Sequence, residues 1–264
     1  VSGPYPLLLF SPYMRGTRDE YTPLVQFWAE NGFVCIVPDH EGTPNRGLLS
    51  DEETVSTWRS RPQDLLAVLD ALAQSEVASR IDMQRVGVGG HLFGAHAASL
   101  TAGCEVYSGG ETVTFADERM DALLLMSPQG RGQGLTETSW LPIDVPLMVT
   151  TGTFDHSART GNTSEWRTEP YQFSDGPQDW LAWIEGLRTD YDGLGQQEPP
   201  DTSGAIASDV LTLTTAFWRD QLYPDSAAAR LLQPSAWTQN PRIKLNTKTG
   251  GKKQSNSLNF NAAA

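Results

Sequence analysis

Apolar residues in this chain gather in short continuous runs that are separated by polar segments. A continuous run, in contrast to an alternating one, is typical of a strand that is covered on both faces of a sheet. We therefore predict strands at the runs of residues 6–10, 33–37, 85–89, 122–126, 147–151 and 180–184.

Between these runs, apolar residues recur every three or four positions, which is the spacing of one face of a helix. The segments with this spacing span residues 22–31, 61–74, 95–102 and 206–222. Strands that alternate with helices predict an α/β fold with a doubly wound, mostly parallel sheet and helices on both faces. In such a sheet the functional site lies beyond the carboxyl ends of the strands.

The length of 264 residues suits one α/β domain, which we place at residues 1–240. The remaining residues 241–264 are polar and basic and show no periodicity. We expect this tail to be disordered or loosely docked on the domain.

The chain carries a formal net charge of −13, and 39% of its residues are hydrophobic. We expect a soluble protein that binds neither nucleic acid nor an anionic membrane surface, because both repel negative charge. No apolar run is long enough to span a bilayer, and no signal peptide is recognisable. The few cysteines and scattered histidines form no disulfide framework and no metal-binding pattern, so we expect no metal and no cofactor.

The most informative segment is GHLFG at residues 90–94. It follows a predicted strand and precedes a predicted helix, which is the context of a G-x-S-x-G turn that raises a nucleophilic serine above a sheet. The two glycines allow a sharp turn in which strand and helix approach closely. The central residue, however, is Leu92, whose side chain has no nucleophilic atom.

Several segments together are similar to one superfamily, namely PLLLFSPY, GTRDEY, NGFVCIVPDH, VGVGGHLFGAHAAS, LLLMSPQG and VPLMVTTGTFD. Over residues 4–233 the chain resembles the α/β-hydrolase superfamily, and within it the bacterial branch related to dienelactone hydrolase and platelet-activating-factor acetylhydrolase. This resemblance implies an α/β-hydrolase fold. Two strands that usually precede the first parallel pair in that family are absent here.

The resemblance also implies a Ser–Asp–His triad, in which the serine attacks, the histidine takes its proton and the aspartate orients the histidine. Carried over to this chain, the serine position falls on Leu92, the aspartate on Asp155 and the histidine on Thr189. A shift of the last assignment does not restore the triad, because no histidine follows His156. Only the acid of the triad is kept.

The oxyanion region of the family is altered as well. Relatives often carry His-Gly after the first parallel strand, where this chain has Pro12 and Tyr13. Proline donates no N–H, and tyrosine adds bulk where a substrate carbonyl would lie. We expect Tyr13, Met14 and Phe93 to line this region, with the Phe93 N–H as a remaining donor.

Further side chains follow predicted strands and are candidates for the pocket: His40, His91, Trp140, His156 and Tyr191. Each has a structural alternative, which is a hydrogen-bonded role for His40, packing beside the turn for His91, and core or rim packing for the aromatic residues. His156 adjoins Asp155 and is a candidate base, although successive side chains rarely point the same way.

Two other interpretations of Leu92 are a laboratory replacement of the serine and a nucleophile turn located elsewhere. The second loss at Thr189 argues against the first interpretation. The flanking glycines and the helix that follows argue against the second.

The sequence therefore favours a hydrolase homologue that has lost serine hydrolysis. It would bind a small apolar or ester- or lactone-like ligand, or support lyase, cyclase or isomerase chemistry. The alternatives are a residual ester or lactone hydrolase that activates water with Asp155, and an interaction protein that uses its surface. An oligomer is compatible with each of them.

Overall fold

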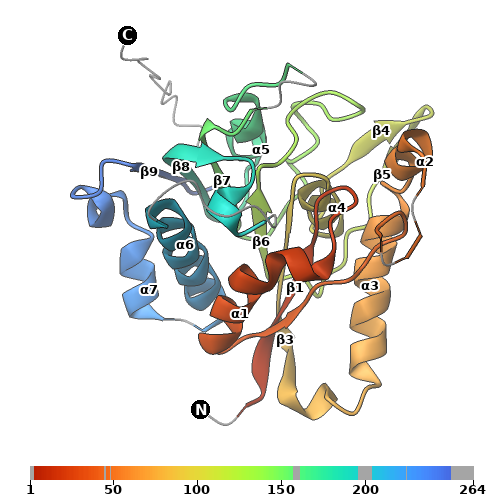
Figure 1. Ribbon diagram of the computed structural model, residues 1–264, viewed down its shortest axis with the longest axis horizontal. Coiled ribbons are helices and arrows are strands. Elements are labelled where there is room, and N and C mark those ends of the chain that lie inside the picture. The colour runs from red at the N-terminus through yellow and green to blue at the C-terminus, as the bar shows by residue number, and fades with distance from the viewer. Residues whose placement is uncertain are drawn as a thin grey trace.

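A seven-stranded sheet forms the centre of the molecule (Figure 1). The computed structural model describes residues 3–44, 46–47, 49–156, 161–195, 204–223 and 225–250. The strands of the sheet are β1 (Tyr5–Ser11), β2 (Val34–Ile36), β3 (Ile81–His91), β6 (Ala122–Met126), β7 (Leu147–Phe154), β8 (Asp179–Arg188) and β9 (Ile243–Lys248). Their order is β2-β1-β3-β6-β7-β8-β9, and every neighbouring pair is parallel except β8 with β9.

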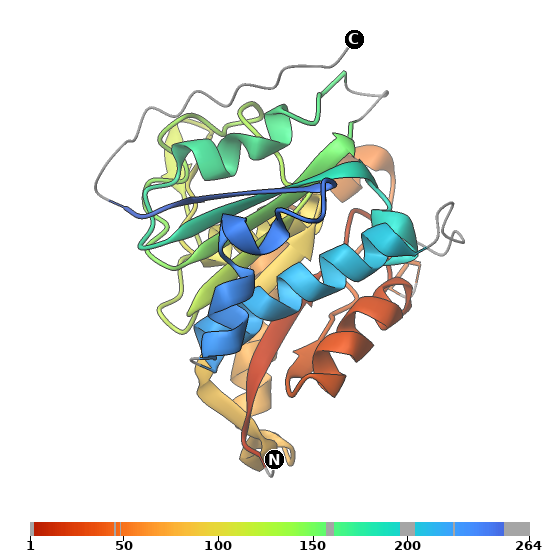
Figure 2. The same ribbon diagram turned by 90° about the vertical axis from the view of Figure 1, so that its left-hand side faces the viewer.

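Helices cover both faces of the sheet, with α5 and α6 on opposite sides in Figure 2. One face carries α1 (Thr22–Glu30), α6 (Ala205–Leu222) and α7 (Ser226–Leu231), and the other carries α3 (Ser60–Ala73), α4 (Phe93–Thr101) and α5 (Glu169–Phe173). The helix α2 (Asp51–Ser56) and the hairpin of β4 (Val106–Ser108) and β5 (Glu111–Val113) lie outside the sheet. Short 3-10 helices span Arg18–Tyr21, Ala78–Arg80, Trp166–Thr168, Tyr191–Gly193 and Pro234–Trp237.

The strand β1 shows how the sheet separates two apolar layers. Leu8 and Phe10 pack in the layer that contains α1 and α6, whereas Leu7 and Leu9 pack in the layer that contains α3 and α4. All four side chains are at most 1% exposed. The continuous apolar run thus reflects burial on both faces, as the sequence predicted.

The prediction of an α/β protein with a mostly parallel sheet is confirmed. All six predicted strands are present, and the four predicted helices correspond to α1, α3, α4 and α6. The strand β2 is less buried than the continuous apolar run predicted, because its three residues are only half-buried. It lies at the edge of the sheet, where one side of the strand has no neighbour.

The expected tail from residue 241 requires a correction. Ile243–Lys248 form β9, which pairs with β8 along its whole length, from Ile243 opposite Ile184 to Lys248 opposite Asp179. Ile243 and Leu245 alternate with polar residues and are each 6% exposed, so the strand buries one face on the core. Residues 251–264 of the predicted tail lie outside the described residues.

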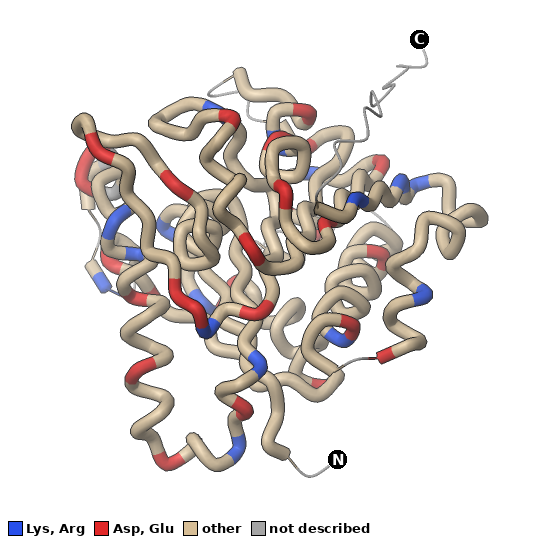
Figure 3. Tube along the Cα trace, turned by 180° about the vertical axis from the view of Figure 1, so that it is seen from behind, with Lys and Arg blue, Asp and Glu red and all other residues tan. Residues whose placement is uncertain are grey.

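Charged side chains are spread over the surface. Acidic residues outnumber basic residues by 32 to 19, and in Figure 3 residues of both signs are distributed over the helices and loops of the side that it shows. Within the described part of the chain, no helix combines the length and the apolar character that crossing a membrane requires.

Candidate functional site

The turn between β3 and α4 consists of Leu92 alone, because β3 ends at His91 and α4 begins at Phe93. The backbone of Leu92 has φ 54° and ψ −114°, a region that residues with a side chain rarely adopt. Its N–H donates to the Met126 carbonyl at 3.0 Å, which ties the turn to the end of β6. The side chain itself is half-buried.

The flanking glycines explain why the chain can turn so sharply. A Cβ atom on Gly90 would lie 2.3 Å from the carbonyl carbon of Gly94, and one on Gly94 would lie 1.9 Å from the carbonyl oxygen of Ser11. Strand, helix and the end of β1 therefore meet at a distance that only glycine permits. The sequence motif predicted this close approach.

The structure places His91 in a ring of aromatic side chains beneath the turn. Its Nδ1 lies 2.8 Å from the hydroxyl of Tyr21, and the rings of Tyr13, Tyr21 and Tyr191 surround it at centroid distances of 6.1, 5.9 and 5.2 Å. Burial, together with the charge of Arg167, lowers the pKa of His91 to about 3. The imidazole is therefore neutral at physiological pH, and its role in this position is to pack.

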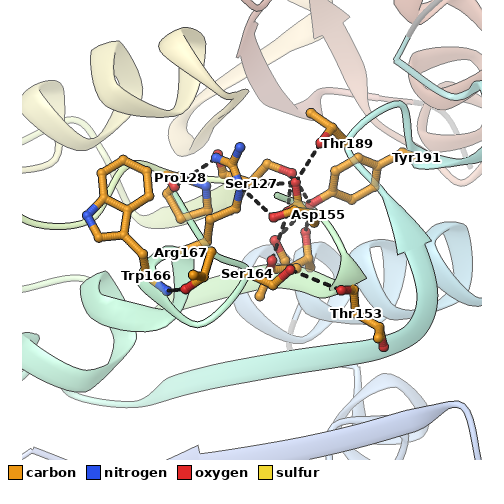
Figure 4. Close-up of polar contacts among 12 residues, drawn as sticks. Ser127, Pro128, Thr153, Asp155, Ser164, Trp166, Arg167, Thr189 and Tyr191 are labelled. Atoms are coloured by element: carbon orange, nitrogen blue, oxygen red, sulfur yellow. Dashed lines mark hydrogen bonds and ion pairs between the residues drawn. The ribbon is translucent and has the colours of Figure 1, made fainter. Parts of the chain in front are cut away.

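A second polar centre forms around Asp155, which follows β7 and is completely buried (Figure 4). Its Oδ2 accepts hydrogen bonds from Ser127 Oγ at 2.6 Å and from Thr151 Oγ1 at 2.7 Å. Its Oδ1 accepts one from Thr189 Oγ1 at 3.0 Å and lies 3.0 Å from Arg167 Nε. The structure thus brings together the two residues that the sequence assigned to the acid and the lost histidine.

Arg167 neutralises this carboxylate in the interior. The side chain is 4% exposed, and its Nη1 donates to the carbonyls of Ser127 at 2.6 Å and Pro128 at 3.2 Å. A general base needs a free lone pair and access to the proton it removes. Both oxygens of Asp155 are engaged and neither is exposed, so this arrangement opposes the activation of water by Asp155.

The loop after β1 offers few free donors. Pro12 has no N–H, and the N–H of Tyr13 donates to the hydroxyl of Tyr21 at 3.1 Å. Tyr13 and Met14 are half-buried, and Phe93 is 8% exposed. Burial and the neighbouring Glu20 raise the pKa of Tyr13 to about 12, so its hydroxyl stays protonated at neutral pH. This loop therefore presents bulk and apolar surface, and the backbone donors that the resemblance would lead one to expect here are lacking at Pro12 and engaged at Tyr13.

His40 belongs to a hydrogen-bonded relay that the sequence did not predict. Ser11 Oγ lies 2.9 Å from His40 Nε2, and His40 Nδ1 lies 2.7 Å from Asp64 Oδ2. The order of atoms is that of a Ser–His–Asp triad. Ser11 and His40 are completely buried, however, and burial lowers the pKa of His40. A substrate carbonyl cannot reach the Ser11 hydroxyl in this conformation.

Of the remaining candidates, Trp140 and Tyr191 are buried and His156 is exposed. Trp140 is 1% exposed and stacks on Phe173 with ring centroids 6.2 Å apart, so it packs in the core, which is one of the roles that the sequence left open beside rim packing and lining a pocket. Tyr191 is also buried, and its hydroxyl donates to the Thr150 carbonyl at 2.7 Å. His156 is exposed and lines an open surface depression with Thr153.

Among the described residues, six non-glycine residues have positive φ, and three of them lie after strands of the sheet. Leu92 after β3, Ser127 after β6 and Tyr191 after β8 all have positive φ values, of 54°, 49° and 54°. Such residues cluster at functional sites, because the surrounding structure must hold them in place.

No protein-family model matches the chain, and no curated protein matches it.

Proposed function

We propose that this protein is a catalytically degenerate member of the α/β-hydrolase superfamily that binds a small, largely apolar molecule at the Leu92 turn. The observation that carries the proposal is the backbone of Leu92, with φ 54° and ψ −114°. A conformation of this kind costs about 1–3 kcal/mol and persists only where the surrounding structure enforces it. Such a strained turn is expected where it presents a nucleophilic side chain. The residue at this turn, Leu92, has no nucleophilic atom.

The contact between Asp155 and Thr189 supports the loss of a proton relay. In a working triad the carboxylate orients an imidazole. Here it accepts a hydrogen bond from a threonine hydroxyl, and Arg167 compensates its charge. A threonine hydroxyl has no basic nitrogen that could take a proton from a nucleophile.

The apolar character of the proposed ligand follows from the residues at the turn. Leu92 and Met14 are half-buried aliphatic side chains, and the aromatic rings of Tyr13 and Phe93 belong to the same region. Apolar and aromatic side chains with few polar groups are typical of small-molecule sites. A lyase, cyclase or isomerase reaction in this place is a variant of the same proposal.

Ester or lactone hydrolysis is the second candidate function, and the relay of Ser11, His40 and Asp64 is the observation that favours it. The burial of Ser11 weighs against this candidate, as the engagement of both Asp155 oxygens weighs against water activation by that residue. Ligand binding therefore remains the better supported function.

An ester assay separates the two candidates. We expect the wild-type protein not to hydrolyse p-nitrophenyl butyrate above the rate of a heat-denatured sample. The double variant Leu92→Ser, Thr189→His should hydrolyse it.

A thermal-shift measurement tests ligand binding. Esters, lactones and polyketide-like molecules should raise the Tm of the wild-type protein. Wild-type turnover that disappears in Asp155→Asn or Ser11→Ala would establish hydrolysis instead.

A further inference from the structure

Arg61 is a buried cation whose hydrogen bonds are incomplete. It lies in the first turn of α3 and has no exposed surface. Nη1 donates to the Pro12 carbonyl at 2.7 Å and lies 3.4 Å from the Tyr13 carbonyl. Nε and Nη2 are buried and have no hydrogen-bond partner among the described residues. Buried donors are rarely left without a partner, so this guanidinium calls for an acceptor.

The nearest acid does not supply that acceptor. Asp64 lies three residues further along α3, but its Oδ2 accepts from His40 Nδ1 at 2.7 Å and its side chain is 42% exposed. Within the described ranges, no carboxylate forms an ion pair with Arg61. Burial lowers the pKa of Arg61 to about 10, which still leaves it charged at neutral pH. A desolvated positive charge without a counter-ion is costly.

The two unpartnered nitrogens form one edge of the guanidinium. Nε and Nη2 carry parallel N–H groups, whereas Nη1, which holds the loop after β1, points the other way. Two parallel donors match the two oxygens of a carboxylate, which is the geometry of bidentate arginine recognition.

The position of this edge connects it with the Leu92 turn. The Cζ atom of Arg61 lies 5.0 Å from the centre of the Phe93 ring, and Phe93 directly follows Leu92. Pro12, which accepts from Arg61, belongs to the loop that also touches Gly94. The Arg61 guanidinium and the apolar Leu92 turn therefore share Pro12 and Phe93 as neighbours.

We propose that Arg61 binds the carboxylate of an amphiphilic carboxylic acid, whose apolar body rests on Leu92 and Phe93. This inference rests on the proposed function and specifies the chemical class of the ligand. Because Nε and Nη2 are buried, the carboxylate must displace side chains around them, among them the Phe93 ring, whose centre lies 5.0 Å from Cζ.

The test compares decanoate with methyl decanoate and with inorganic phosphate. In wild-type protein, decanoate should shift the ¹H–¹⁵N resonance of Arg61 Nε and raise Tm, whereas methyl decanoate should bind about tenfold or more weakly, because a charge-assisted hydrogen bond is lost. Arg61→Gln should abolish the preference for decanoate. The matched control is Arg59→Gln, which removes the same charge from an exposed residue of the same segment and should keep the preference.

The outcomes separate this inference from the proposed function. Equal binding of decanoate and its methyl ester, or a preference that survives Arg61→Gln, overturns the role of Arg61 and leaves the apolar site intact. Binding of neither molecule contradicts both proposals. If phosphate shifts the Arg61 Nε resonance and Tm as strongly as decanoate does, the inference that the ligand is an amphiphilic carboxylic acid is overturned. If Arg61→Gln fails to fold, the Nε resonance of the wild-type protein decides, because an unchanged resonance at saturating decanoate also overturns the inference.

Discussion

The backbone strain at Leu92 can be measured by comparing two small substitutions. Alanine usually stabilises a protein relative to glycine by about 0.5–1 kcal/mol, because glycine loses more freedom on folding. At Leu92 the order should be reversed, with Leu92→Gly more stable than Leu92→Ala by about 1 kcal/mol, since only glycine adopts positive φ without strain. Urea denaturation of both variants measures this difference. A more stable alanine variant would mean that the turn is relaxed.

The buried imidazole of His91 should make stability depend on pH. Its pKa is about 3 in the folded protein, well below the ordinary value of 6.5, so between these values only the unfolded chain takes up the proton. Stability should therefore fall with decreasing pH in this window, by up to about 1.4 kcal/mol per pH unit from this group. The same contribution is fully present above the ordinary value.

Denaturation at about pH 6 and about pH 5 tests the assignment. The free energy of unfolding of His91→Gln should depend less on pH than that of the wild-type protein, with a slope that is smaller by about 1 kcal/mol per pH unit. The control His156→Gln changes an exposed histidine and should keep the wild-type slope. Identical slopes in all three proteins would show that His91 is not held neutral by the fold.

Individual contacts were predictable only where a motif specified them. The close approach at Gly90 and Gly94 follows from the strand–turn–helix motif, whereas the pairing of Asp155 with Thr189 followed only from what the resemblance to the α/β-hydrolase superfamily implies. Arg167 was not predictable, because nothing in its local sequence distinguishes it from a surface arginine. The relay through His40 joins residues 29 and 24 positions apart, and neither spacing matches a helix or strand repeat.

Between elements, the ion pair of Asp155 with Arg167 fastens the end of β7 to the 3-10 helix at Trp166–Thr168. Removal of one partner from a buried pair leaves an uncompensated charge and costs about 3–5 kcal/mol. We expect Arg167→Met to lose about 3 kcal/mol of stability, since three hydroxyls still bind Asp155.

Arg131→Met is the matched control for this substitution. Arg131 is 44% exposed and pairs with Glu137 and Glu169 at the surface, so its loss should cost less than about 1 kcal/mol. Chemical denaturation measures both variants. An equally small loss in Arg167→Met would show that the Asp155 carboxylate needs no counter-ion in the fold.

The strand β9 shows why elements are harder to predict at the chain end. Its six residues, IKLNTK, alternate in character, but they contain only two strong apolar residues and a net basic charge. The composition of this segment therefore favoured the prediction of a disordered or loosely docked tail. The edge of β8 supplies the missing information, because a strand can add to an exposed edge with little apolar content of its own.

For the whole molecule, the parallel sheet explains why distant segments share one region. Leu92, Ser127, Asp155 and Thr189 each follow the carboxyl end of a different strand, from β3 to β8. Parallel strands place these ends along the same edge, which is where α/β sheets hold their sites. The sequence predicted this layout because the order of apolar runs fixes which loops reach that edge. It did not predict how the polar groups pair there, since pairing depends on side-chain geometry.

Mass spectrometry of the intact protein after treatment with an alkyl fluorophosphonate tests the central claim most directly. The reagent phosphonylates a serine that a neighbouring base activates. Without a nucleophile at position 92, and with Ser11 and Ser127 completely buried, the wild-type protein should gain no adduct, whereas the variant Leu92→Ser, Thr189→His should gain one. A stoichiometric adduct on the wild-type protein, at Ser11 or at any other serine, would contradict the account of an inert turn.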